Sequence, residues 1–221
     1  MSDTANASSL ATAEADAASP VRKRPKPGER RGQILQALAT MLEQPGAERV
    51  TTAALAARLD VSEAALYRHF ASKAQMFEGL IEFIEQSVFS LVNQILEADA
   101  APDATPAEAG LRQVTRIVTM LMQFGEKNPG MTRVMVGDAL VYENERLQQR
   151  MNQFFDKIEA TLKQCLRPVA EASGSASPSV DAQVRASVLT AFAAGRLQRF
   201  ARSGFKRAPQ EHLERSLQQM L

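Results

Sequence analysis

The chain has 221 residues, of which 45% are hydrophobic and 23% are charged. These values are ordinary for a globular protein with a real core, and the length allows one or two domains. The single cysteine, Cys165, excludes a disulfide framework and a thiolate zinc site. We interpret it as a helix-packing residue in a reducing compartment. No apolar run has the length of a membrane span and no export signal is visible, so we expect a cytoplasmic protein.

Positive charge is concentrated in one part of the chain. The formal net charge is +1, yet residues 21–73 hold ten Lys and Arg against five Asp and Glu. Residues 74–221 hold sixteen against seventeen. This asymmetry predicts a small basic module joined to a larger neutral one.

The first 27 residues are predicted to be a disordered tail with a basic end. Residues 1–20 are mainly Ala, Ser, Thr, Asn and Asp, which bury too little to offset the entropy of ordering a chain. The basic residues that follow are interrupted by Pro25 and Pro27, which favour an extended arm.

Beyond Pro27 the apolar spacing is helical, and no strand-like alternation of useful length occurs. A first helix is indicated by a stripe that ends before Pro45 and Gly46. The residues of this stripe are Ile34, Leu35, Leu38, Met41 and Leu42. We therefore predict an all-α protein.

Two short helices follow, and each has a clear start signal. Thr51 and Ser62 can each cap a helix, and each is preceded by a valine that can pack against a leucine one turn in. Ser72 then caps a third start, with Gln75 completing a capping box. The spacing predicts a helix near 52–59, a short turn, a helix near 62–70 and a long helix from 73.

This layout is typical of a helix-turn-helix, whose second helix reads DNA. With Leu66 pointing inward, the helical turn of 100° per residue places Ala64 and Arg68 on the outer face. An arginine can bind guanine or phosphate, and the methyl groups of Ala64 and Ala65 can contact thymine methyls. The remaining candidate DNA contacts lie at the edges of this surface, in the arm and at the helix starts: Arg30, Arg31, Thr51, Thr52, Ser62, Tyr67, His69 and Lys73.

Other interpretations of these residues stay open at this point. Helix-turn-helix geometry also occurs in proteins that bind no nucleic acid. His69 alone is more often a hydrogen-bonding group, and the run from Arg22 to Arg31 can be a solvated tail. The position of that run directly before the first helix favours an arm that lies along DNA.

The remaining residues predict a larger helical part. The long helix carries one apolar stripe: Phe77, Leu80, Ile81, Ile84, Val88, Leu91, Val92 and Ile95. Phe83 lies about 120° from the centre of that stripe, so it is either exposed to a partner or packed under the next helix. Segment 110–124 is apolar on more than one face, which suits deep burial, a ligand cavity or a partner groove, and it ends at Asn128-Pro129-Gly130.

Two further helices complete the predicted larger part. A stripe over 147–166 ends near Pro168, and residues 172–180 form a loop. The last helix, roughly 181–203, contains Ala193-Ala194-Gly195. Such small residues allow a close approach of another helix, either within the chain or at a dimer seam.

The short helices resemble the DNA-binding signature of TetR-type regulators. The resemblance rests on Thr51-Thr52, Leu55-Ala56, Val61-Ser62 and Leu66-Tyr67-Arg68-His69-Phe70 followed by Lys73. Asp60 replaces the usual glycine of the turn, and aspartate tolerates a left-handed backbone better than most residues. The family implies an N-terminal three-helix DNA-binding domain, here residues 28–73, and a C-terminal helical dimerisation domain, here 74–221.

The sequence is further similar to the SlmA-type nucleoid occlusion factors, from about residue 29 to about 209. The similarity rests on residues 61–70, Leu80-Ile-Glu-Phe-Ile-Glu85, Phe124-Gly-Glu-Lys-Asn-Pro-Gly130, Arg146-Leu-Gln and Phe205-Lys. It implies a homodimer that binds palindromic double-stranded DNA on the nucleoid and antagonises assembly of the division GTPase FtsZ. The implied FtsZ contacts are Phe83, Met120, Phe124, Lys127 and Asn128. Lys127 stands where arginine is expected, so the charge is kept and the planar fork is lost.

We therefore expect a DNA-binding nucleoid occlusion factor without a cofactor. The alternative is a TetR-type repressor released by a small ligand. An enzyme is disfavoured because the sequence contains no glycine-rich phosphate loop, no nucleophile elbow and no metal-ligand cluster. A purely structural helical protein is disfavoured by the helix-turn-helix spacing.

Overall fold

All regular secondary structure in the computed structural model is helical over the residues that it describes, which are 28–44, 50–98 and 104–221. The helices are α1 (Glu29–Leu42), α2 (Thr52–Arg58), α3 (Glu63–Tyr67), α4 (Lys73–Ala98), α5 (Pro106–Lys127), α6 (Pro129–Met135), the 3-10 turn η2 (Asp138–Leu140), α7 (Glu145–Ala172), α8 (Pro178–Arg202) and α9 (Leu213–Met220). The predicted all-α class is confirmed. The predicted tail over 1–27 and the helix-ending Pro45 lie outside the described residues.

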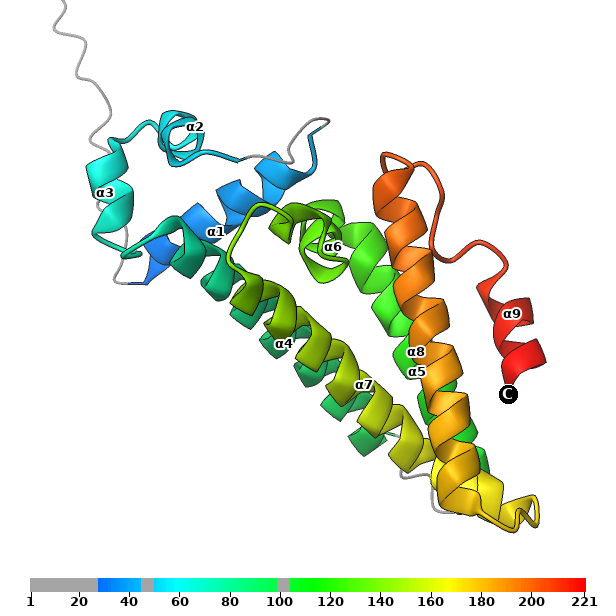
Figure 1. Cartoon of the computed structure of the whole chain (residues 1–221). Coiled ribbons are helices and arrows are strands. Elements are labelled where there is room, and N and C mark those ends of the chain that lie inside the picture. Colours follow the sequence, from blue (N-terminus) through cyan, green and yellow to red (C-terminus); the bar gives the residue numbers. More distant parts are fainter. Residues whose placement is uncertain (1–27, 45–49, 99–103) are drawn as a thin grey trace, which may run out of the picture.

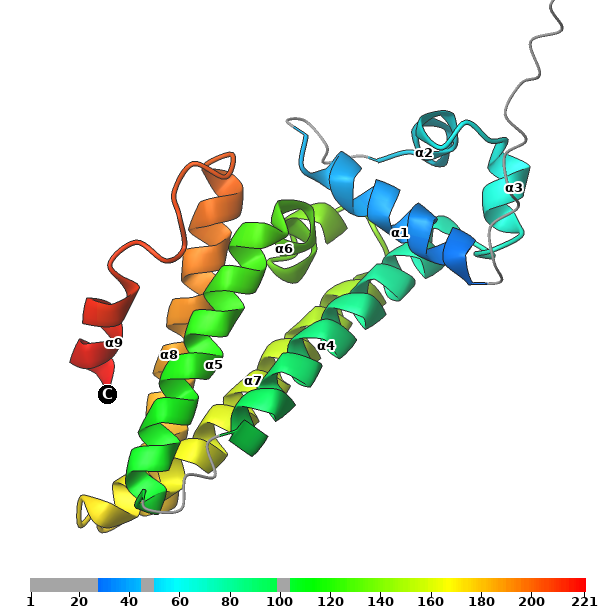
Figure 2. The same ribbon diagram turned by 180° about the vertical axis from the view of Figure 1, so that it is seen from behind.

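The first three helices form one end of the molecule, and α4 runs from them along α7 into the larger helical part (Figures 1 and 2). Helices α5, α7 and α8 pack together there, with the short α6 between α8 and α1 (Figure 1). Helix α9 is the last element of the chain, and its Leu213 and Leu217 are buried.

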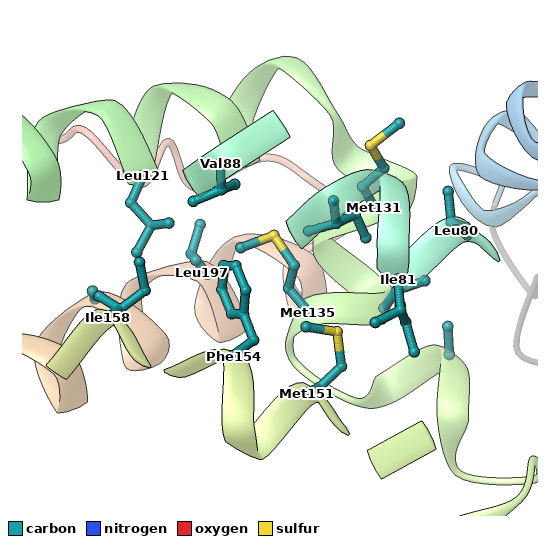
Figure 3. Close-up of a cluster of buried hydrophobic side chains, with 14 of the residues drawn as sticks. Leu80, Ile81, Val88, Leu121, Met131, Met135, Met151, Phe154, Ile158 and Leu197 are labelled. Carbon is teal, nitrogen blue, oxygen red and sulfur yellow. The ribbon is translucent and has the colours of Figure 1, made fainter. Parts of the chain in front are cut away.

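One hydrophobic core joins both parts of the molecule. Figure 3 shows side chains from α4, α5, α6, α7 and α8 converging in its centre, where Ile81, Leu121 and Phe154 are fully buried. The α1 side chains Ile34 and Leu38 belong to the same cluster. Burying a large apolar side chain stabilises the fold by roughly 1.5–3 kcal/mol. Because α1 contributes to the same core as the larger part, this burial also holds the two parts together.

Ion pairs tie α4 to α7 beside this core. Arg150 Nη2 lies 2.7 Å from Glu85 Oε2, and Arg146 pairs with Glu78. Both arginines lie in the first two turns of α7. These two ion pairs fix the register between α4 and α7 at the end nearest α1 to α3.

Several predicted boundaries differ from those in the structure. Pro168, expected to end a helix, lies inside α7, which continues to Ala172 because Val169 and Ala170 are buried against their neighbours. Helix α8 begins at Pro178 rather than near 181, since a proline suits the first helical position. Leu91, expected in the core, is 36% exposed because α4 is covered there only on the side of Val88, Val92 and Ile95.

The small residues of α8 divide between two faces. Ala193 is buried within the chain, whereas a Cβ on Gly195 would meet nothing within 4 Å.

Cys165 is buried as predicted, and burial raises the pKa of its thiol to about 11. None of the helices in the described part of the chain combines the length and apolarity that crossing a membrane requires.

Gly110 provides a direct test of the packing between α5 and α7. A Cβ at this position would lie 2.1 Å from the carbonyl oxygen of Cys165, which is backbone and cannot rotate away. We predict that Gly110→Ala lowers the free energy of unfolding by about 2–3 kcal/mol, the cost of overpacking a core. Urea denaturation followed by circular dichroism measures this.

Gly32→Ala is the matched control. Gly32 lies inside α1, and a Cβ at this position would meet nothing within 4 Å. Alanine should therefore stabilise the helix by up to about 1 kcal/mol. Equal effects of the two substitutions would contradict the close approach.

Candidate nucleic-acid interface

Side-chain caps start both short helices, as the sequence predicts. Thr51 Oγ1 accepts a hydrogen bond from the Ala54 N–H at 3.2 Å, and Ser62 Oγ accepts one from the Ala65 N–H at 3.3 Å. Asp60, in the turn between them, has φ of 53°, the left-handed conformation in which glycine is usual. The turn therefore forms without the glycine.

The outer face of α3 is open to solvent. Ala64 and Arg68 are exposed and Tyr67 is 44% exposed, whereas Leu66 is fully buried against the other short helices. Ala65 is half-buried at the edge of this face. Two alanines beside an arginine leave a low surface with one long cation, a shape that allows close approach to the base edges of a duplex.

Helix α3 is shorter than predicted. It ends at Tyr67, with Arg68 as its C-cap, rather than near residue 70. The chain must turn there so that Phe70, which is 1% exposed, enters the core and α4 can begin at Lys73. His69 remains exposed on this turn.

Arg31 has an intramolecular role that the sequence did not indicate. Its Nη1 donates to the His69 carbonyl oxygen at 2.8 Å, and its guanidinium lies 4.2 Å from the centre of the Phe70 ring. Arg31 thereby connects α1 to the end of α3. Arg30, one residue earlier, donates to the side chain of Gln33 at 2.8 Å.

Two other predicted DNA contacts also have partners within the chain. Thr52 donates to Glu63 Oε2 at 2.6 Å, which links the starts of α2 and α3. Lys73 pairs with Glu143, in the segment before α7, and its ammonium lies 5.7 Å from the centre of the Phe77 ring. These side chains position the short helices, and Lys73 connects them to the larger part.

The five predicted partner contacts lie on two adjacent helices and the junction after them. Phe83 on α4 is 46% exposed. Of the two alternatives that the sequence left open for this side chain, exposure to solvent is therefore the correct one. Met120 and Phe124 on α5 are half-buried against the core, and Lys127 is exposed at the end of that helix. Asn128 Nδ2 donates to the Phe124 carbonyl oxygen at 2.8 Å, so this side chain caps the end of α5.

Sequence reasoning missed a residue at which the two parts touch. A Cβ on Gly130, the first turn of α6, would lie 1.9 Å from the carbonyl oxygen of Ala39 in α1. The backbones of α1 and α6 therefore touch. The glycine itself was visible in the sequence, but only as a helix breaker.

No group of three or more His, Cys, Asp or Glu side chains within residues 28–44, 50–98 and 104–221 is placed to hold a metal ion.

The chain matches two family descriptions in the order of its two parts. Residues 34–80 match the bacterial regulatory proteins of the tetR family, and residues 108–221 match the SlmA-like, tetracyclin repressor-like C-terminal domain. The first match covers most of α1, then α2, α3 and the start of α4. The second match covers α5 to α9.

Curated relatives are similar over most of the chain. The nucleoid occlusion factor SlmA of Aliivibrio fischeri is 50% identical over 189 residues, which are 85% of this chain and 92% of the relative. That of Vibrio vulnificus is 48% identical over 190 residues, 86% and 92% of the two chains.

Solved structures share the fold at low identity. The TetR-family regulator PfmR of Thermus thermophilus aligns with a TM-score of 0.65 at 22% identity, over 86% of this chain and 97% of that one. The fatty acid degradation regulator FadR of Bacillus halodurans aligns with a TM-score of 0.68 at 16% identity, over 89% and 96%. These likenesses confirm the fold of a helix-turn-helix domain followed by a helical domain.

Arg31 and Arg68 should differ in what they contribute to folding. Arg31→Ala removes a charged hydrogen bond and a cation–π contact, so we predict a loss of about 1–2 kcal/mol in the free energy of unfolding. Arg68→Ala removes an exposed side chain and should change stability by less than about 0.5 kcal/mol. Chemical denaturation of both variants measures the difference, and a larger loss for Arg68→Ala would show that its side chain is structural.

Proposed function

The chain belongs to the SlmA-type nucleoid occlusion factors of the TetR family, and we propose that it binds palindromic DNA as a homodimer and, when bound, antagonises FtsZ assembly over the nucleoid. The observation that carries the DNA-binding part is the exposed face of α3, where Ala64 and Arg68 project from a helix capped at Ser62. The family supports a binding role rather than a catalytic one, in the cytoplasm and on the nucleoid.

Helix α3 is the element that would enter the major groove. Arg68 would contact guanine or phosphate, and Ala64 and Ala65 would approach thymine methyls. Tyr67 and His69 flank this face and are exposed, which suits phosphate contacts that fix the register. Arg30, Arg31, Thr51, Thr52, Ser62 and Lys73 complete the proposed interface. The intramolecular bonds of Arg31 and Lys73 leave further N–H donors of both side chains available to phosphate. The single hydroxyl donor of Thr52 is used by Glu63, so a phosphate contact there requires that this bond is exchanged.

An apolar stripe on α8 supports the homodimer. Its members follow helical spacing along the outer face, exposed except for the half-buried glycine, at which a Cβ would meet nothing within 4 Å: Val180, Val184, Val188, Ala191 and Gly195. Exposed rows of valines followed by small residues suit a two-fold seam with a second copy. A dimer of this kind would place its two α3 helices about 34 Å apart, one turn of DNA, which calls for a palindromic site.

The proposed FtsZ surface combines an exposed aromatic with a cation. Phe83 on α4 offers a large apolar contact, and Lys127 at the end of α5 offers a positive charge to an acidic group. Met120, Phe124 and Asn128 would complete it. Because Asn128 directly precedes α6, this surface adjoins the helix that contacts the DNA-binding helices.

Light scattering by FtsZ polymers tests the proposal. The DNA site is first selected from a random duplex library by binding to the protein. We predict that wild-type protein with this duplex lowers polymer scattering, while protein alone or with a scrambled duplex does so at least several-fold less. Phe83→Ala should lose the effect with unchanged DNA affinity, because Phe83 lies on α4 and away from α3.

Val141→Ala is the matched control, since Val141 is a 66% exposed apolar residue outside the proposed surface. It should retain the effect. DNA binding without any DNA-dependent change in scattering would contradict the proposal and favour a ligand-released repressor.

A further inference from the structure

Basic side chains gather at the C-terminal end of α8 and in the segment after it. We call Arg199, Arg202, Lys206 and Arg207 the α8 basic cluster; all four are exposed. Among described residues the only ion pair that these four form joins Arg202 to Asp138 at 3.8 Å. The cluster is therefore a strong local excess of positive charge in a part of the molecule that is neutral as a whole.

The segment that carries Lys206 and Arg207 is held in place. Ser203 Oγ accepts hydrogen bonds from the Lys206 N–H at 3.1 Å and the Arg207 N–H at 2.9 Å. The Phe205 ring packs against Phe200, with 5.2 Å between the ring centres. A fixed backbone presents the cations together, which lowers the entropy lost on binding an anion.

The cluster adjoins the DNA-binding part of the molecule through α6. Arg133 of α6 lies 5.2 Å from the centre of the Phe205 ring, and Gly130 of α6 touches Ala39 of α1. Figures 1 and 2 show the end of α8 beside α6, at the end of the molecule that carries α1 to α3. One short helix thus separates the cluster from α1.

The cluster also continues the proposed dimer seam. Arg199 and Arg202 follow Gly195 by four and seven residues, so they extend the outer stripe of α8 towards its C-terminus. In a two-fold dimer joined along that stripe, the two copies of the cluster would come close together. Each copy would contribute three cations besides the Arg202–Asp138 pair, and these six would repel one another unless an anion lay between them.

Compensation of the helix dipole explains only part of this charge. Arg199 and Arg202 lie in the last turn of α8, where cations are favourable. Lys206 and Arg207 lie beyond the helix end and have no such role.

We propose that the α8 basic cluster binds the phosphate backbone of the bound DNA at the centre of the palindrome, between the two half-sites contacted by α3. The inference rests on the proposed dimer and on DNA binding. Its position favours DNA over an acidic peptide, because a two-fold axis through the seam also passes through the centre of a palindrome. Phosphate contacts of this kind add affinity without sequence preference.

The test compares duplex affinity of the wild type and the triple variant Arg199→Gln, Lys206→Gln, Arg207→Gln by fluorescence anisotropy over a salt series. Arg202 is kept because it pairs with Asp138. We expect affinity to fall about tenfold or more at moderate salt, and the slope of log K against log salt to shrink by about 0.9 for each lost contact. The ratio of cognate to scrambled affinity should not change. A variant with wild-type affinity and slope would overturn the proposal.

A second measurement places the contact on the DNA. Duplexes with neutral methylphosphonates at the central phosphates should reduce wild-type affinity and leave the triple variant unaffected. Methylphosphonates at the outer phosphates should weaken both proteins equally. Equal loss for both proteins with the centrally modified duplex would contradict the central position.

Matched variants separate this inference from the proposed function. Lys163→Gln with Arg185→Gln removes positive charge at the far end of α7 and α8, where Arg167 is kept because it pairs with Glu171, and should keep the wild-type salt slope. Sedimentation must show a dimer for the triple variant, while Val184→Arg, in the seam, should be monomeric.

Arg68→Ala tests DNA recognition itself, and its failure to weaken binding would count against the proposed function. A triple variant that loses only FtsZ antagonism would identify an acidic protein partner and overturn the DNA proposal.

Discussion

The arrangement of this molecule depends on the close approach of α6 to α1. A side chain of even one carbon at Gly130 would lie 1.9 Å from the Ala39 carbonyl oxygen and 2.8 Å from its carbon, both backbone atoms. The two backbones therefore approach each other with no room for a side chain at this point, and such close packing resists relative sliding of the two helices. Helix α1 in turn holds the end of α3 through Arg31. The position of the proposed reading helix is therefore set from the larger part of the molecule.

Helix α6 is small, yet it adjoins each of the proposed surfaces. It begins directly after Asn128, the last of the proposed FtsZ contacts, and its buried Thr132 donates to the Gly125 carbonyl oxygen of α5 at 2.8 Å. Arg133 contacts the segment after α8, where the dimer stripe ends. Lys73 with Glu143 adds a second connection between the short helices and the larger part. These contacts, together with α4 and the shared core, connect the proposed surfaces and give DNA-dependent activity a physical route.

Local signals in the sequence predicted what is local in the structure. The caps at Thr51 and Ser62, the left-handed turn at Asp60 and the start of α4 all follow from residues within one turn of each other. The outward direction of Ala64 and Arg68 followed from helical geometry once Leu66 was taken as buried. The family resemblance supplied the proposed FtsZ contacts, which periodicity alone does not indicate.

Tertiary packing decided the features that the sequence did not predict. Pro168 lies inside α7 because the buried residues after it continue the helix. The short helices α6 and α9 carry too few turns to show a periodic stripe. The partners of Arg31 and Lys73 lie 38 and 70 residues away, so their intramolecular roles were invisible to spacing.

The most direct test of the contact between α1 and α6 compares wild-type protein with Gly130→Ala. The measured quantity is the dependence of DNA affinity on the spacing of the two half-sites. Duplexes that differ by single inserted or deleted base pairs at the centre are compared with an isolated half-site. If α6 sets the position of α3, the variant should lose most of the wild-type preference for one spacing, at unchanged half-site affinity. An identical spacing profile in both proteins, with the variant folded by circular dichroism, would contradict the account.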